Sequence, residues 1–131
     1  MHYISNIETI LYVNNQQAST EFYTKLFRKM PDLNVPGMTE FKLTETFKLG
    51  LMPNNSIARI LSDKTPHPFQ GHGIPRCELY FYVDDIEQGF EHALQTGAKL
   101  ISPAEERDWG DCVCYFSDPD GHIIAFAQKK Y

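Results

Sequence analysis

The chain has 131 residues, of which 42% are hydrophobic and 13% are aromatic. A chain of this length folds as one compact domain that buries roughly two thirds of its unfolded surface, and this composition excludes intrinsic disorder. The formal net charge of −5 disfavours a nucleic-acid partner, because an acidic surface repels the phosphate backbone. We therefore expect a single globular domain over residues 1–131 that does not bind nucleic acid.

The N-terminal segment MHYISNIETI shows no targeting signal. A secretory signal needs a basic region followed by a continuous apolar run, and a membrane span needs about 20 consecutive apolar residues. The sequence contains neither pattern. It therefore predicts a cytoplasmic protein that does not enter a membrane.

The strongest organising feature is an internal repeat. The segment IETILYVNN at residues 7–15 returns as CELYFYVDD at residues 77–85, and an offset of seventy positions aligns Glu8 with Glu78. Both segments alternate between apolar and more polar residues, which predicts a β-strand in each. The less apolar face carries Glu8, Ile10 and Tyr12 in the first strand and Glu78, Tyr80 and Tyr82 in the second.

The same succession of elements follows each repeated strand. An Asn or Asp pair supplies a helix N-cap, and an apolar stripe at helical spacing comes next. The stripe is Ala18, Phe22, Leu26 and Met30 in the first half, and Ile86, Phe90, Ala93 and Leu94, ended by Gly97, in the second. Three strand-like segments complete each half: LNV, EFKLT and FKLGLM in the first, and AKLI, CVCYF and HIIAFA in the second.

These elements predict an α+β fold made of two tandem βαβββ modules, at residues 4–52 and 77–128. Each helix can cover only one side of its sheet, so the other side must face its twin, a partner chain or a ligand. Residues 53–76 join the modules as a linker rich in Pro and Gly, in which SIARIL favours a helical turn. His67 and His72 lie in this linker without an assigned role.

The chain resembles the vicinal oxygen chelate superfamily, which includes glyoxalase I, extradiol dioxygenases, fosfomycin resistance enzymes and bleomycin resistance proteins. The resemblance runs from Ile4 to Gln128 and rests on the strand ends LYVNN and FYVDD, the helix segment STEFYTKLF and the closing WGDCVCYFSDPDGHIIAFA. It implies that the two modules form a curved, incompletely closed mixed sheet around a cavity, with the helices on the outside. It also implies a homodimer.

In metal-dependent members of that superfamily, the first strand of each module and later strands supply the ligands of a divalent ion. By position, Glu8 and Glu78 match the two first-strand ligands, and carboxylates suit Mn²⁺, Mg²⁺ or Zn²⁺. The sequence departs from the pattern at Ala125, where the family has a last-strand Glu, and FKLGLM in the first module offers no donor. His122, in the turn after DPDG, is expected to close a hairpin and not to bind metal. Two carboxylates without a third donor make a poor site, so we expect no cofactor.

The candidate ligand-binding residues are the polar and aromatic side chains of the less apolar strand faces, together with the single tryptophan: Glu8, Tyr12, Glu78, Tyr80, Tyr82 and Trp109. Aromatic walls with a few polar groups are typical of ligand pockets. Two close carboxylates perturb one another, which suits a proton-transfer pair or a clamp for a cationic ligand. The alternatives are solvated carboxylates on a wet strand face, tyrosines that pack a module or dimer interface, and a tryptophan in ordinary rim packing.

These features predict a protein that binds an organic small molecule in the sheet cavity by sequestration, without catalysis. In motif it is closest to the metal-free bleomycin-resistance-like branch. The alternative is a divalent-metal-dependent lyase, isomerase or dioxygenase that uses Glu8 and Glu78 with a third ligand from residues 53–76. A third possibility is a degenerate domain that only binds another protein.

Overall fold

The computed structural model describes residues 3–130, so residues 1, 2 and 131 of the predicted domain lie outside the described part. Its contacts divide the chain into two units, Met1–His72 and Gly73–Tyr131, called here the first and the second unit. Each unit holds one four-stranded mixed sheet that does not close into a barrel. The predicted α+β class is therefore confirmed, whereas a cavity enclosed by both modules stays a prediction.

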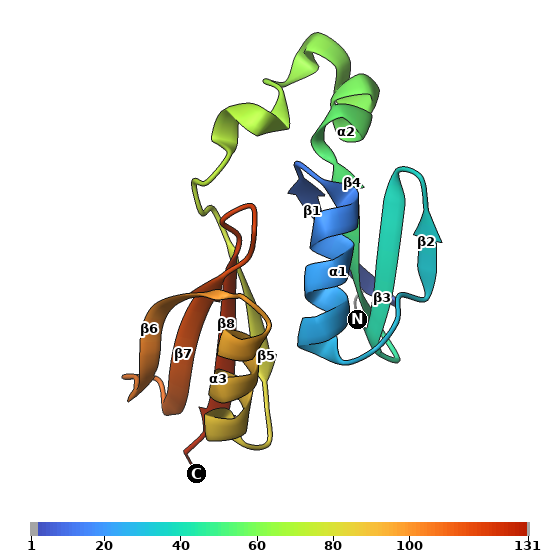
Figure 1. Ribbon diagram of the computed structural model, residues 1–131. Helices are drawn as coiled ribbons and strands as arrows, with labels where there is room; N and C mark the ends of the chain where they lie inside the picture. Colours follow the sequence, from blue (N-terminus) through green and yellow to red (C-terminus); the bar gives the residue numbers. More distant parts are fainter. Residues whose placement is uncertain (1–2, 131) are drawn as a thin grey trace. The chain divides into compact units, whose positions relative to one another are not determined.

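The elements of both units follow the order strand, helix and three strands, as Figure 1 shows. The first unit contains β1 (Ile7–Val13), α1 (Gln16–Phe27), β2 (Leu33–Val35), β3 (Met38–Thr44), β4 (Phe47–Pro53), α2 (Asn54–Leu61) and the short 3-10 helices η1 (Ser62–Lys64) and η2 (Pro68–Gly71). The second unit contains β5 (Glu78–Tyr82), α3 (Ile86–Gln95), β6 (Lys99–Glu106), β7 (Asp111–Ser117) and β8 (Ile123–Lys129). Within residues 3–130, none of the helices has the length and apolar character needed to cross a membrane.

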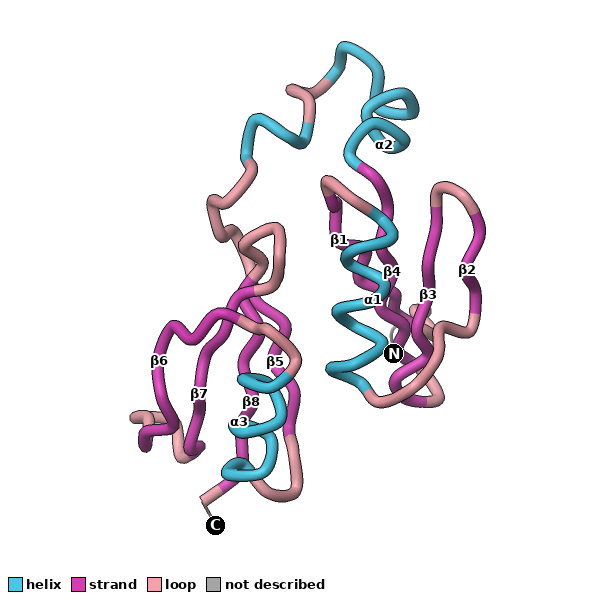
Figure 2. Tube along the Cα trace, viewed as in Figure 1, coloured by secondary structure: helices cyan, strands magenta, loops and turns pink. Residues whose placement is uncertain are grey.

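The two sheets share one topology (Figure 2). The strand order is β1-β4-β3-β2 in the first unit and β5-β8-β7-β6 in the second. In each sheet the first strand pairs in parallel with the last one, and the other neighbours are antiparallel. The parallel register sets Ile10 beside Gly50 and Tyr80 beside Ala125. Because Ile10 and Tyr80 are seventy residues apart, Gly50 and Ala125 are equivalent positions of the two modules.

The helices begin where the sequence predicts. The side chains of Asn15 and Asp85 each accept a hydrogen bond from the backbone N–H three residues further on, at 3.0 and 3.1 Å. Helix α1 ends at Phe27, because Arg28 adopts the left-handed conformation with φ of 54°. Met30, which the apolar stripe assigned to this helix, lies beyond its end and is 73% exposed, so this part of the prediction was wrong.

A hydrophobic core lies on the helix-covered face of each sheet (Figure 1). In the first unit, Tyr23 of α1 and Phe41 of β3 are both fully buried. In the second unit, the ring of Phe116 packs against Phe90 of α3 and Phe126 of β8, with centroid distances of 5.5 and 6.4 Å. The opposite face of each sheet carries the repeated Glu and the tyrosines, as the alternation of the strands predicts.

The segment between the modules is more ordered than a plain linker. SIARIL lies within α2, so the predicted helical turn is confirmed. His67 caps η2, since its Nδ1 accepts a hydrogen bond from the N–H of Phe69 at 3.1 Å and its Nε2 bonds to Oδ1 of Asn55 at 2.9 Å. This histidine therefore has a local structural role in the first unit.

Candidate functional site

The repeated Glu has two different surroundings. Glu8 is half-buried on β1 and lies in register with Lys48 on β4. Glu78 begins β5, is exposed and lies in register with Ile123 on β8. The same residue of the repeat is therefore embedded among charged groups in the first unit and open to solvent in the second.

The carboxyl group of Glu8 lies over the backbone of Gly50. A Cβ atom at Gly50 would stand 2.5 Å from Oε2 of Glu8 and 3.1 Å from Ile10, so the missing side chain provides the space for the carboxyl group. Oε2 is buried and has no hydrogen-bond partner among the described residues. Such an unsatisfied buried acceptor disfavours the ionised form of the group.

A second carboxyl group adjoins Glu8. Burial raises the pKa of Glu8, and a hydrogen bond with Glu40 and the negative charge of Glu40 raise that pKa further, while Lys48 lowers it. Lys48 itself donates a hydrogen bond to Oε1 of Glu40 at 3.4 Å. The carboxyl group of Glu8 therefore holds a proton more readily than an isolated glutamate does.

This carboxyl pair borders a cavity of about 570 Å³ in the first unit. Cavities of roughly 300 to 1,000 Å³ are the usual size for a small organic ligand. The lining comes from β1, the hairpin of β3 and β4, and the start of β2: Asn6, Ile7, Glu8, Asp32, Leu33, Glu40, Lys42, Thr44, Glu45, Thr46, Phe47 and Lys48.

In the second unit a chain of hydrogen bonds joins four side chains. Nε1 of Trp109 donates to the hydroxyl of Tyr80 at 2.8 Å, and this hydroxyl donates to Oδ2 of Asp111 at 2.6 Å. The hydroxyl of Tyr82 donates to the same oxygen at 3.0 Å. The structure thus brings together three of the six predicted residues around Asp111, which is only 4% exposed.

Electrostatics fixes the direction of these hydrogen bonds. Burial, assisted by the bond to Asp111, raises the pKa of Tyr80 to about 12. The bonds from Tyr80 and Tyr82, together with the charge of Lys129, lower the pKa of Asp111. Lys129 also places its ammonium 4.6 Å from the ring centre of Tyr82. At neutral pH Tyr80 is therefore a donor and Asp111 is an ionised acceptor.

Ala125 lies beneath aromatic rings. It is fully buried beside Val113 and Ala127, and Tyr80 and Tyr115 pack on this cluster. Both tyrosines are in register with Ala125 from the neighbouring strands. The position where the family's motif carries a Glu is therefore a methyl group covered by two phenol rings.

The resemblance to metal-dependent proteins implies a divalent metal site on the first and last strands of the two modules. Four equivalent positions on these strands correspond to that site. Glu8 and Glu78 carry a donor there, whereas Gly50 and Ala125 offer none. The charged groups that act on Glu8 are Glu40 and Lys48, and neither is an imidazole. These residues do not fit a tightly held divalent ion of the family's kind.

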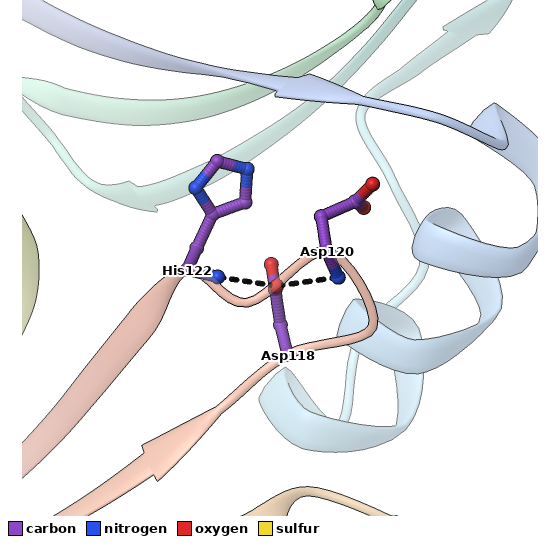
Figure 3. Close-up of side chains that lie close together, drawn as sticks. All are labelled: Asp118, Asp120 and His122. Atoms are coloured by element: carbon purple, nitrogen blue, oxygen red, sulfur yellow. Dashed lines mark hydrogen bonds between the residues drawn. The ribbon is translucent and has the colours of Figure 1, made fainter. Parts of the chain in front are cut away.

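A second group of metal-type donors lies in the turn between β7 and β8 (Figure 3). Asp118, Asp120 and His122 place one donor atom each within 4.8 Å of one another. Oδ1 of Asp118 accepts the backbone N–H groups of both Asp120 and His122 at 2.9 Å, as the dashed lines in Figure 3 show. The backbone of His122 accepts from Asp118 N–H in return, so this group closes the hairpin.

Two residues of these clusters were missed by the sequence reasoning. Glu40 and Asp111 lie on the same strand faces as the predicted residues, in register with Gly50 and Lys129. Alternation along EFKLT and DCVCYF could have identified their faces, but only the strand register shows which side chains they approach. Tyr12, the remaining predicted residue, is 38% exposed on β1.

Known proteins with similar sequences were found. A model of the glyoxalase-like domain matches residues 6–129. The uncharacterized protein Mb0911c of Mycobacterium bovis is 26% identical over 121 residues, which cover 90% of this chain and 79% of that protein. The uncharacterized protein YraH of Bacillus subtilis is 26% identical over 117 residues, 87% of this chain and 90% of that protein.

Solved structures show the same fold. A glyoxalase-related enzyme from Fulvimarina pelagi matches with a TM-score of 0.78 and 21% identity, over 93% of this chain and 86% of that chain. A glyoxalase/bleomycin resistance protein/dioxygenase from Nocardioides matches with a TM-score of 0.74 and 19% identity, over 98% of this chain and 84% of that chain. At such identities the likeness establishes the fold alone.

Proposed function

The chain belongs to the glyoxalase-like family of the vicinal oxygen chelate superfamily, and on that premise we propose that it binds an organic small molecule without a metal ion. The ligand lies against the open, aromatic face of the second sheet, and binding sequesters it without breaking a bond. The same premise supports a homodimer, which light scattering of the purified protein would test.

The observation that carries this proposal is the aromatic layer over Ala125. Where a metal-dependent relative needs a carboxylate, this chain has a methyl group under Tyr80 and Tyr115. Trp109 and Tyr82 extend the aromatic surface and are 59% and 56% exposed. Tyr82 donates a hydrogen bond to Asp111, and Trp109 is linked to Asp111 through Tyr80. These bonds hold both rings in place. Such preorganisation favours binding, because little side-chain entropy is lost when the ligand binds.

One observation favours a competing function. The buried Oε2 of Glu8 has no partner among residues 3–130, which is a feature of metal sites deprived of their ion. The competing function is a divalent-metal-dependent lyase, isomerase or dioxygenase that uses Glu8 and Glu78. Metal analysis of untagged protein, repeated after adding Mn²⁺, Zn²⁺, Ni²⁺ and Fe²⁺ in turn, separates the two. We expect no stoichiometric uptake; near-stoichiometric metal that Glu8→Ala or Glu78→Ala removes would establish the competitor.

Binding itself is tested by thermal shift with bleomycin, catechol and an S-substituted glutathione as probes. A ligand that binds the native state raises the unfolding midpoint in proportion to the logarithm of its concentration. We expect the shift to disappear in Trp109→Ala and to persist in Phe69→Ala, which removes a half-exposed aromatic ring from η2 in the first unit. A shift that is unchanged in Trp109→Ala would refute binding on this face.

A further inference from the structure

A second cavity of the first unit is lined by neutral polar side chains. It has a volume of about 350 Å³ and lies between the residue that follows β1, the start of α2 and η2. Four carboxamides, one imidazole and one phenyl ring line this cavity, called here the carboxamide cavity: Asn14, Asn54, Asn55, Gln70, His67 and Phe69. The described lining includes no Asp, Glu, Lys or Arg side chain. It therefore suits a neutral ligand that both donates and accepts hydrogen bonds.

Asn54 brings an amide without a partner to this cavity. Its side chain is only 7% exposed although it belongs to the lining. The amide makes no hydrogen bond with another group within residues 3–130. Buried amides are normally hydrogen-bonded, because an unpaired one costs free energy. The unpaired amide at the cavity wall therefore marks a place where a ligand would supply the missing partner.

His67 determines which atoms of Asn55 are left for a ligand. Nδ1 of His67 accepts the N–H of Phe69 at 3.1 Å, so the imidazole proton is on Nε2, which donates to Oδ1 of Asn55 at 2.9 Å. The amide nitrogen of Asn55 thus keeps its two donors. Pro53 provides no side-chain cap at the start of α2, so the first turn of this helix adds backbone N–H donors beside Asn54 and Asn55. These donors favour a ligand that carries a carbonyl oxygen.

Phe69 adds a ring surface to the carboxamide cavity. The imidazole of His72 stacks on the Phe69 ring, with a centroid distance of 5.0 Å and an interplanar angle of 21°. The phenyl side chain is nevertheless 50% exposed. The stacked imidazole holds the ring in place and leaves surface on which a flat ligand can lie. Stacking of a heterocycle on an aromatic side chain is favourable for neutral rings.

We propose that the carboxamide cavity binds a small neutral ring that contains a cyclic amide, the chemistry shared by pyrimidine nucleobases and lactams. The ring carbonyl accepts from the amide nitrogen of Asn55 and the first turn of α2, the adjacent ring N–H donates to the amide oxygen of Asn54, and the ring stacks on Phe69. A carboxamide suits such a ligand because its donor and acceptor lie side by side, as they do in the cyclic amide.

The test is an NMR titration of isotope-labelled protein with uracil. Uracil methylated on both ring nitrogens is the matched probe, since it keeps the ring and both carbonyl groups but has no N–H donor. We expect the side-chain amide signals of Asn54 and Asn55 to shift with saturable uracil binding. The methylated probe should bind about tenfold more weakly, because the amide oxygen of Asn54 then stays unpaired. Equal binding of both probes, or uracil addition that leaves these signals unmoved, overturns the proposal.

Two variants of the cavity and one control make the assignment specific. Asn54→Ala and Phe69→Ala should each weaken uracil binding about tenfold, through the lost hydrogen bond and the lost stacking surface. Gln95→Ala removes an exposed carboxamide from the end of α3 in the second unit and should leave binding within about twofold. Unaltered uracil binding in Phe69→Ala, whose half-exposed ring is not needed for the core, refutes the site.

The two proposed sites can fail independently, because they use different rings in different units. Trp109→Ala should abolish binding on the aromatic face of the second sheet and leave uracil binding within about twofold. Phe69→Ala should have the opposite effects. Loss of uracil binding in correctly folded Trp109→Ala, judged by circular dichroism, would place the uracil site outside the carboxamide cavity.

Discussion

Replacing Asp111 removes the acceptor on which two tyrosine hydroxyls converge. A hydrogen bond to a charged group contributes about 1.5 to 3 kcal/mol when it is buried. The hydrogen bond from Tyr80 to Asp111, at 2.6 Å, is partly buried, whereas the half-exposed hydroxyl of Tyr82 can replace its hydrogen bond to Asp111 by one to water. We therefore expect Asp111→Ala to destabilise the second unit by about 2 to 3 kcal/mol, and Asp111→Asn, which keeps an acceptor oxygen, by about half as much.

The chain carries its own probe for this measurement. Trp109 is the single tryptophan and donates to Tyr80, so its fluorescence during urea unfolding reports on the second unit. Asp63→Ala, at an exposed position of η1, removes the same charge without this network and should change the free energy of unfolding by less than about 0.5 kcal/mol. The reasoning is refuted if Asp111→Ala is no more destabilising than Asp63→Ala. It is also refuted if a double-mutant cycle with Tyr80→Phe shows no coupling.

Three further measurements address single groups of the two units. The pKa of Tyr80, raised from 10.0 to about 12, means that stability is lost as the pH rises from 10 to about 12, and Tyr80→Phe should flatten this loss in alkaline urea titrations. Gly50→Ala should lower the raised pKa of Glu8 toward its ordinary value, followed by NMR of its side-chain carbon during a pH titration, because the displaced carboxyl group leaves its buried position. Glu8→Gln should stabilise the protein at neutral pH, whereas Glu78→Gln should not, as circular dichroism during urea unfolding would show.

The repeated architecture was predictable from local signals. Alternation identified the strands, and the Asn and Asp pairs marked the helix starts, because Asn15 and Asp85 accept the backbone N–H groups that a first helical turn leaves unpaired. The offset of seventy between Glu8 and Glu78 indicated that both halves share one topology, and both sheets do. The end of α1 was not predictable from the stripe, because it depends on one residue, Arg28, adopting a left-handed conformation.

The partners of the predicted site residues could not be read from the sequence, because they depend on strand register. Glu40 reaches Glu8 only because β4 lies between their strands and presents Gly50, which has no side chain to separate them. Glu40 is equivalent to Tyr115, because these residues pair with the equivalent positions Gly50 and Ala125. Asp111 lies four residues before Tyr115, and the matching residue of the first module, Pro36, precedes β3. A sequence repeat thus located the faces of the sheets but not the contacts across them.

The effects of Glu8→Gln and Glu78→Gln on stability test whether the two copies of the repeat share only a fold or also a chemical role. The pKa of Glu8 is raised above its ordinary value of 4.5, so this group favours the folded state fully below that pH and less as the pH rises through its folded pKa. Glutamine in its place stays neutral and donates to Glu40, so Glu8→Gln should gain about 0.5 to 1 kcal/mol at neutral pH. Glu78 is exposed, and its replacement should change little. A loss of stability in Glu8→Gln, or equal effects at the two positions, would contradict the raised pKa of Glu8. The expected difference would mean that Glu8 lowers the stability of the protein whereas Glu78 does not. A residue that is kept although it lowers stability is typical of a binding site.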